Sequence, residues 1–226
     1  MPVEAASDDA AGVLRDVARL GPYFDVVTVG VDGPAWRSFP RDGERLRALT
    51  RDYGERLGTT ERRVAGSLVF QGLAARLWSP AVAAAAVGIV PDLRDLRWRW
   101  APGEPIRLGL AEPAGWHVQG IAEAAALVHD VVMDGQLRPL REAMLEFTGL
   151  ADGLIWGNAA SALAGSLNVG PAEPARGDLV RALLAREPLA GAGNFGPDGF
   201  VRKSCCLYCR VPGGGMCGDC GLLPGS

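Results

Sequence analysis

The chain lacks an excess of charge of either sign. Its 226 residues include 23 Lys and Arg against 26 Asp and Glu, which gives a net charge of −3. This balance counts against a general nucleic-acid binder and against charge-driven attraction to a membrane surface. Only one basic residue, Lys203, is a lysine, and we interpret this scarcity as a compositional bias toward arginine. No clear Ser-His-Asp or paired-carboxylate arrangement is present to indicate nucleophilic or acid-base catalysis.

Long uncharged apolar runs are also missing. A membrane span needs about 18 such residues, whereas the run 77–91 is shorter and contains Pro80, and the run 153–172 contains asparagines, serines and glycines. Residues 1–15 lack the basic start and short apolar core of a secretory signal. We therefore expect no membrane span and a cytoplasmic location.

The composition, with 48% hydrophobic and 22% charged residues, is that of an ordinary globular protein. Helical spacing and stop signals predict a series of helices, at 4–20, 41–57, from Thr60 to about Trp78, 81–87 after a break or kink at Pro80, 121–133, 136–147, 154–167 and 178–186. The prediction is an α+β fold: a mostly helical single domain with a short antiparallel β-hairpin and a cysteine-rich, metal-binding tail. We divide the chain into a scaffold region at 1–200 and a cysteine-rich, metal-binding segment at 201–226.

Two short segments alternate between apolar and basic residues and predict the hairpin. They are 96–100 and 106–110, separated by a turn-rich stretch, and residues 23–31 are β-branched enough to form another strand. Trp98 and Trp100 would lie on the apolar face. The other face would carry Arg97, Arg99 and Arg107, whose guanidinium groups suit the carboxylate or catecholate oxygens of an anionic ligand, although a solvated sheet face is the favoured explanation.

All the cysteines lie in the C-terminal tail. Adjacent cysteines, an odd total and a reducing compartment make disulfides a poor explanation, so metal ligation is expected. Two ligand sets are open, and both include Cys206, Cys217 and Cys220. With Cys209 the spacing is C-x2-C-x7-C-x2-C, as in a short zinc ribbon or rubredoxin-like site, and with Cys205 it is C-C-x10-C-x2-C.

The sequence Ser-Cys-Cys-Leu-Tyr at 204–208, followed by Pro-Gly-Gly-Gly-Met-Cys-Gly-Asp-Cys at 212–220, resembles the C-terminal signature of FhuF-type siderophore-iron reductases. Trp-Gly-Asn-Ala-Ala-Ser at 156–161 also resembles a segment of that family. The resemblance implies a [2Fe–2S] cluster held by Cys205, Cys206, Cys217 and Cys220, with Cys209 outside the pattern, and a function in reducing siderophore-bound ferric iron. It also implies that 1–200 is the siderophore-binding region and 201–226 the cluster-binding segment. Arg202 and Lys203 would offset the charge of the cluster or simply be solvated.

The residues themselves are compatible with that cluster. Gly213 to Gly215 and Gly218 leave room for backbone amides to approach sulfur, and no Cys-x-His pair exists for Rieske ligation. Gly-x-Gly-x-x-Gly at 191–196 matches a dinucleotide fingerprint, but prolines flank it and no acidic residue follows at the required distance, so we expect a loop there. Electrons would then come from an external ferredoxin-like or flavoprotein-like donor. An electron-carrier protein and a zinc-stabilised interaction protein are the alternatives.

Overall fold

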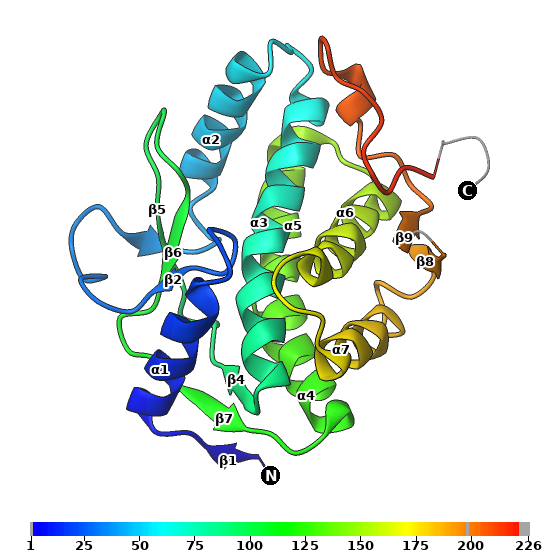
Figure 1. Ribbon diagram of the computed structural model, residues 1–226. Helices are drawn as coiled ribbons and strands as arrows, with labels where there is room; N and C mark the ends of the chain where they lie inside the picture. Colours follow the sequence, from blue (N-terminus) through cyan, green and yellow to red (C-terminus); the bar gives the residue numbers. More distant parts are fainter. Residues whose placement is uncertain (1, 198, 222–226) are drawn as a thin grey trace.

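A long central helix organises the protein. The computed structural model describes residues 2–197 and 199–221, and in it α3 (Arg62–Ala86) runs through the middle of the molecule with the other helices around it (Figure 1). Those helices are α1 (Ser7–Ala18), α2 (Gly43–Arg56), α4 (Ile121–Val128), α5 (Arg138–Thr148), α6 (Asp152–Gly165) and α7 (Pro174–Leu184). The mostly helical α+β fold expected from the sequence is confirmed.

Of the two outcomes predicted at Pro80, a break or a kink, the break is wrong, because α3 continues through this residue. An internal proline costs about 3 kcal/mol, since it removes one helical hydrogen bond and crowds the preceding turn. Against this cost, Leu77, Trp78 and Val82 are fully buried, and burial of each such side chain contributes roughly 1.5–3 kcal/mol. Burial of these side chains against the rest of the protein therefore offsets the cost of Pro80 and keeps α3 continuous.

Helix α3 is also the one helix, within the described part of the chain, that is long and apolar enough to cross a membrane. In its most apolar stretch, 72% of the residues are buried inside the protein. Its composition is thus explained by its place in the core.

The predicted gap between the helices at 121–133 and 136–147 is also absent. A π-helical segment, His129–Leu137, joins α4 to α5 without interruption. This wider turn lets the buried Gln136 amide donate to the backbone carbonyls of Leu93 and Arg94.

The predicted hairpin is confirmed as β5 (Arg97–Arg99) and β6 (Arg107–Gly109), with Trp98 opposite Leu108. Trp98 and Trp100 are buried, as their alternation predicts. Two further strands complete this sheet in the order β2-β6-β5-β3, where β2 (Val26–Val27) is the short remainder of the strand expected at 23–31 and β3 is Arg37–Ser38. A second sheet, not expected from the sequence, has the order β1-β7-β4 and consists of Val3–Glu4, Gly115–His117 and Ile89–Pro91.

Most of the loop expected at 191–196 is a strand, because only Gly191 and Ala192 are outside β8. Strand β8 (Gly193–Gly196) pairs with β9 (Gly199–Arg202) in a hairpin that leads into the cysteine tail. A side chain at Gly193 would collide with the Phe200 ring and the Val201 carbonyl, so this position needs glycine.

The boundary that we expected between the scaffold and the tail, between residues 200 and 201, falls inside β9. The tail is also packed onto the scaffold, because the Leu207 and Val211 side chains belong to the main hydrophobic core.

Candidate metal centre

The cysteine tail lies on a platform formed by α3 and α6. At Gly157 on α6, any side chain would collide with the Ser204 hydroxyl, so the absence of a Cβ lets the tail approach the helix closely. On α3, the fully buried Ser67 donates to the Cys206 carbonyl at 2.7 Å. Asn158 donates in turn to the Ser67 hydroxyl at 2.8 Å. These contacts fix the backbone of Cys206 against both helices.

A buried arginine fixes both ends of the tail. Arg202, at the end of β9, donates from Nε to the Asp219 carboxylate at 2.9 Å, from Nη1 to the Asn158 carbonyl at 2.6 Å, and from Nη2 to the Ser161 hydroxyl. Its backbone N–H also donates to the Asp219 carbonyl oxygen at 3.0 Å. Burial opposes ionisation of Asp219, but hydrogen bonds and the nearby Arg202 charge outweigh it and hold the pKa of this carboxyl below its usual value. Asp219 is therefore an ionised anchor between Cys217 and Cys220.

The thiols form two close pairs. Cys206 donates from Sγ to Cys217 Sγ at 3.4 Å, and the Sγ atoms of Cys205 and Cys209 are 3.9 Å apart. Two thiolates on one tetrahedral metal, each bound at about 2.3 Å, lie about 3.8 Å apart, so either pair suits two ligands of one metal. Among residues 2–197 and 199–221, however, no group of three or more His, Cys, Asp or Glu side chains is arranged to hold a metal ion.

Backbone groups near the thiols also fit a sulfur-rich cluster. Leu207 has a φ of 68°, which is unusual for a bulky residue, and its N–H donates to Cys205 Sγ at 3.3 Å. Amide hydrogen bonds of this kind stabilise cluster thiolates and tune their potential. At Gly214 a Cβ would lie only 2.5 Å from the Tyr208 carbonyl oxygen, so the glycine run allows the chain to fold back closely. The sulfur donors and the backbone amide beside Cys205 therefore suit iron–sulfur ligation.

The protonation of the thiols is set by their surroundings. Burial, with a smaller contribution from the hydrogen bond to Cys206, raises the pKa of Cys217. The hydrogen bond to Cys205 raises the pKa of the exposed Cys209. A bound metal deprotonates its thiol ligands, so metal binding at Cys217 would release a proton.

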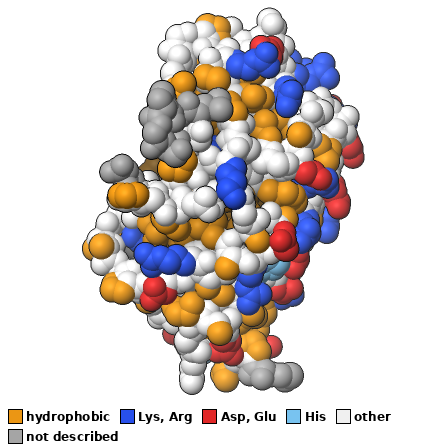
Figure 2. Space-filling model, turned by 90° about the vertical axis from the view of Figure 1, so that its right-hand side faces the viewer, with side chains coloured by type: hydrophobic (Ala, Val, Ile, Leu, Met, Phe, Trp, Pro, Cys, Tyr) orange, Lys and Arg blue, Asp and Glu red, His pale blue; other side chains and the backbone are white. Residues whose placement is uncertain are grey.

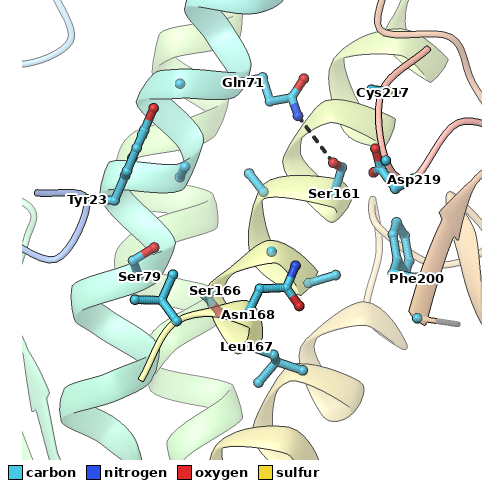
Figure 3. A pocket seen from close by; sticks show the side chains of 18 of the residues that line it. Tyr23, Gln71, Ser79, Ser161, Ser166, Leu167, Asn168, Phe200, Cys217 and Asp219 are labelled. Atoms are coloured by element: carbon cyan, nitrogen blue, oxygen red, sulfur yellow. Dashed lines mark hydrogen bonds between the residues drawn. The ribbon is translucent and has the colours of Figure 1, made fainter. Parts of the chain in front are cut away.

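A cavity of about 770 Å³ opens beside the tail, between α3 and α6. Figure 3 shows Cys217 and Asp219 at one side of it, Tyr23 and Ser79 at the other, and Ser166 and Asn168 below. Cys206 also lines the cavity, and Gln71 donates to Ser161 at 3.2 Å in its wall. Asp219 is the one charged residue in the described lining, and its charge is balanced by Arg202.

Residues 202–221 match the family profile described as the FhuF 2Fe-2S C-terminal domain. Over these residues the cysteine tail is similar to this FhuF domain. The resemblance seen in the sequence is thus confirmed for this segment, and the family description names the 2Fe–2S cluster. No curated protein matches the chain.

The hairpin arginines lie apart from the FhuF-type tail. Strands β5 and β6 are on one side of α3, and α6 with the tail is on the other (Figure 1). Arg97 pairs with Asp32 at 3.6 Å and Arg107 with Asp25 at 3.5 Å. The structure therefore does not bring Arg97, Arg99 and Arg107 together with the cysteines, and their role in substrate binding stays a prediction.

Sequence reasoning missed the network that positions the FhuF-type tail. Arg202 was expected to offset cluster charge or to be solvated, yet it is fully buried among Asp219, Asn158 and Ser161, whereas Lys203 is exposed. The segment 156–161 contained the available signal, because its Gly157, Asn158 and Ser161 are the residues of α6 that meet the tail. A lone sequence does not show that Arg202 is their partner.

Proposed function

We propose that this protein is a cytoplasmic ferric-siderophore reductase, an oxidoreductase that delivers one electron to chelated Fe(III). The observation that carries the proposal is the FhuF-type tail, in which Cys205, Cys206, Cys217 and Cys220 would hold the cluster. When bound, a [2Fe–2S] cluster supplies one-electron transfer at a potential set by its surroundings. A reducing compartment keeps cysteines available as metal ligands, which agrees with the proposed cytoplasmic location.

The chain's own residues perform the supporting tasks. Cys206 and Cys217 line the cavity, so the cavity reaches the candidate metal centre. Arg202 and Asp219 hold the two ends of the tail together, and Leu207 donates a hydrogen bond to Cys205. The substrate Fe(III) is bound strongly by hard oxygen donors and Fe(II) much less strongly, so reduction releases iron and leaves the ligand intact.

The test starts from protein purified without oxygen. We expect a red-brown protein with iron and sulfide in equal amounts. After chemical reduction and removal of excess reductant, a ferric siderophore should reoxidise it and yield Fe(II) to an Fe(II)-specific chelator. Colourless protein with stoichiometric zinc would support an interaction protein instead. An intact, reduced cluster that persists with every ferric chelate tried would support an electron carrier.

We also propose an external donor of the ferredoxin or flavoprotein class. The Gly-x-Gly-x-x-Gly motif at 191–196 forms strand β8 and the two residues before it, rather than the turn between a strand and a helix. NADH or NADPH alone should therefore give no useful turnover until such a donor is added. Rapid reduction by either nicotinamide alone would contradict this part of the proposal.

A further inference from the structure

The rim of the α3/α6 cavity gathers exposed apolar side chains. The described chain has eight large hydrophobic side chains that are exposed, and four of them, Tyr23, Val169, Phe195 and Tyr208, line this one cavity. Phe195 packs edge-on against Phe200, another lining residue, at a centroid distance of 5.5 Å. On the face that carries β8, β9 and the tail, Figure 2 shows hydrophobic and uncharged groups with basic side chains among them. Exposed apolar groups that gather in one place mark binding surfaces.

The interior of the cavity combines apolar walls with a few polar groups. Gln71 and Ser79 come from α3, and Ser166 and Asn168 from the turn that follows α6. Its volume of about 770 Å³ is within the range of small-molecule sites, which are mostly apolar with a small number of orienting polar groups. The core helices on both sides keep this shape in place, because α3 and α6 pack directly against each other.

The cavity reaches the candidate metal centre itself. Cys206 and Cys217, whose Sγ atoms are 3.4 Å apart, belong to its lining. The β5–β6 arginines, which the sequence suggested as the chelate site, are absent from the described lining. A molecule in the cavity therefore contacts the redox site, whereas one on the arginine face is separated from it by α3.

We propose that the cavity between α3 and α6 is the site where the intact ferric chelate docks, with its organic backbone against the aromatic rim and its iron end toward Cys206 and Cys217. This inference rests on the proposed reductase function and adds the substrate's position. One electron leaves the reduced protein and converts Fe(III) to Fe(II). No covalent bond forms, and the freed ligand oxygens take up protons from water as Fe(II) departs.

Calorimetric titration of the cluster-loaded protein with a redox-inert probe tests the site. The probe is the gallium(III) complex of desferrioxamine B, a hexadentate trihydroxamate, which can bind but cannot accept the electron. Gly165, at the end of α6, lines the cavity and has open space at its Cβ position, so Gly165→Phe fills the cavity without a backbone clash. Gly153→Phe, on the same helix with equally open space but outside the cavity, is the matched control.

We expect Gly165→Phe to weaken gallium-chelate binding at least tenfold and Gly153→Phe to leave it within twofold. Asn168→Trp, at an exposed lining position, should weaken binding in the same direction if Gly165→Phe does not fold. Unchanged affinity in both cavity variants, or no binding to the wild type, would overturn the assignment. Fe(II) release by the wild type is measured in parallel. If Fe(II) is released but binding does not depend on the cavity, the reductase function is supported and the docking site is contradicted. If binding depends on the cavity but no Fe(II) is released, the reductase function is contradicted.

Discussion

The two sides of α3 use arginine in opposite ways. On the β5–β6 side, Arg97 and Arg107 are about half exposed and face nearby carboxylates across 3.5–3.6 Å. On the α6 side, the Arg202 side chain is fully buried and makes hydrogen bonds to Asp219, Asn158 and Ser161. Exposed ion pairs contribute about 0–1 kcal/mol, whereas removing one partner of a buried pair costs about 3–5 kcal/mol. Arg202 therefore contributes most to the site, although the alternation of apolar and basic residues that points to exposed arginines does not reveal it.

The largest expected effect concerns the ligand set. Cys206→Ser should lose most of the iron and the visible absorption, because this buried thiol pairs with Cys217 at 3.4 Å in the tail. Cys205→Ser should also lose the cluster or strongly alter its potential, while Cys209→Ser should retain the spectrum and near-normal activity. Iron and sulfide analysis, together with visible spectroscopy, measures the cluster content of each variant.

Rescue by Cys209 needs a control, because its Sγ lies only 3.9 Å from that of Cys205. The double variant with both Cys205 and Cys209 changed to serine removes that substitute ligand. A full cluster in Cys205→Ser together with its loss in Cys209→Ser would favour the zinc-ribbon-like set and contradict the one proposed.

The second prediction compares the two classes of arginine directly. Arg202→Met should lower the free energy of unfolding by on the order of 3 kcal/mol, because the Asp219 carboxylate is left without its buried partner. Arg97→Met should change it by less than about 1 kcal/mol. Chemical unfolding of both variants, with cluster content recorded at zero denaturant, provides the measurement. Equal effects from the two substitutions would show that burial of Arg202 does not anchor the tail.

The third prediction concerns the close approach of the tail to α6. Gly157→Ala should destabilise the protein by about 1–3 kcal/mol and reduce cluster retention, because the added methyl group collides with the Ser204 hydroxyl. Gly153→Ala on the same helix has open space and should be neutral or slightly stabilising. Adding Ser204→Ala to Gly157→Ala removes the colliding oxygen and should restore much of the loss. If Ser204→Ala restores neither stability nor cluster retention, the contact between Gly157 and Ser204 is not the cause of the loss.

The smallest effect is expected on the other side of α3. Changing Arg97, Arg99 and Arg107 together to alanine should leave the affinity for gallium chelates within twofold, because α3 separates these residues from the cavity. The same titration should be run with a neutral or cationic trihydroxamate complex and with a trianionic tricatecholate complex. A loss of tenfold or more for either complex would restore the arginine face as the substrate site.

The sequence predicted the elements whose signals are local. Helical spacing located most helices, and the alternation around Trp98 and Trp100 located the β5–β6 hairpin with its buried face. Pro80 misled because its local cost is outweighed by packing that depends on the whole fold. The short strands β1, β4 and β7 have two or three residues each, too few to show a period.

In the candidate site, too, the sequence predicted the local part and missed the part that depends on tertiary packing. The cysteine spacing and the glycines around it are a local pattern, and they led to the family. The partners of Arg202 are 41 and 44 residues earlier in the chain, and the cavity depends on Tyr23, α3 and α6 meeting the tail. Tertiary packing brings these groups together, and no single segment encodes that packing.

Single-turnover oxidation of the reduced protein tests the central claim most directly. Reduced, cluster-loaded protein is mixed with increasing ferric trihydroxamate, while absorbance and trapped Fe(II) are followed, with and without the gallium complex of the same ligand. The account predicts one Fe(II) for each electron lost from the protein, a rate that saturates with chelate concentration, and competitive inhibition by the gallium complex. A rate that rises linearly without saturation and ignores gallium would mean that the chelate is reduced by collision, without a docking site, and a protein that stays reduced would contradict the reductase function itself.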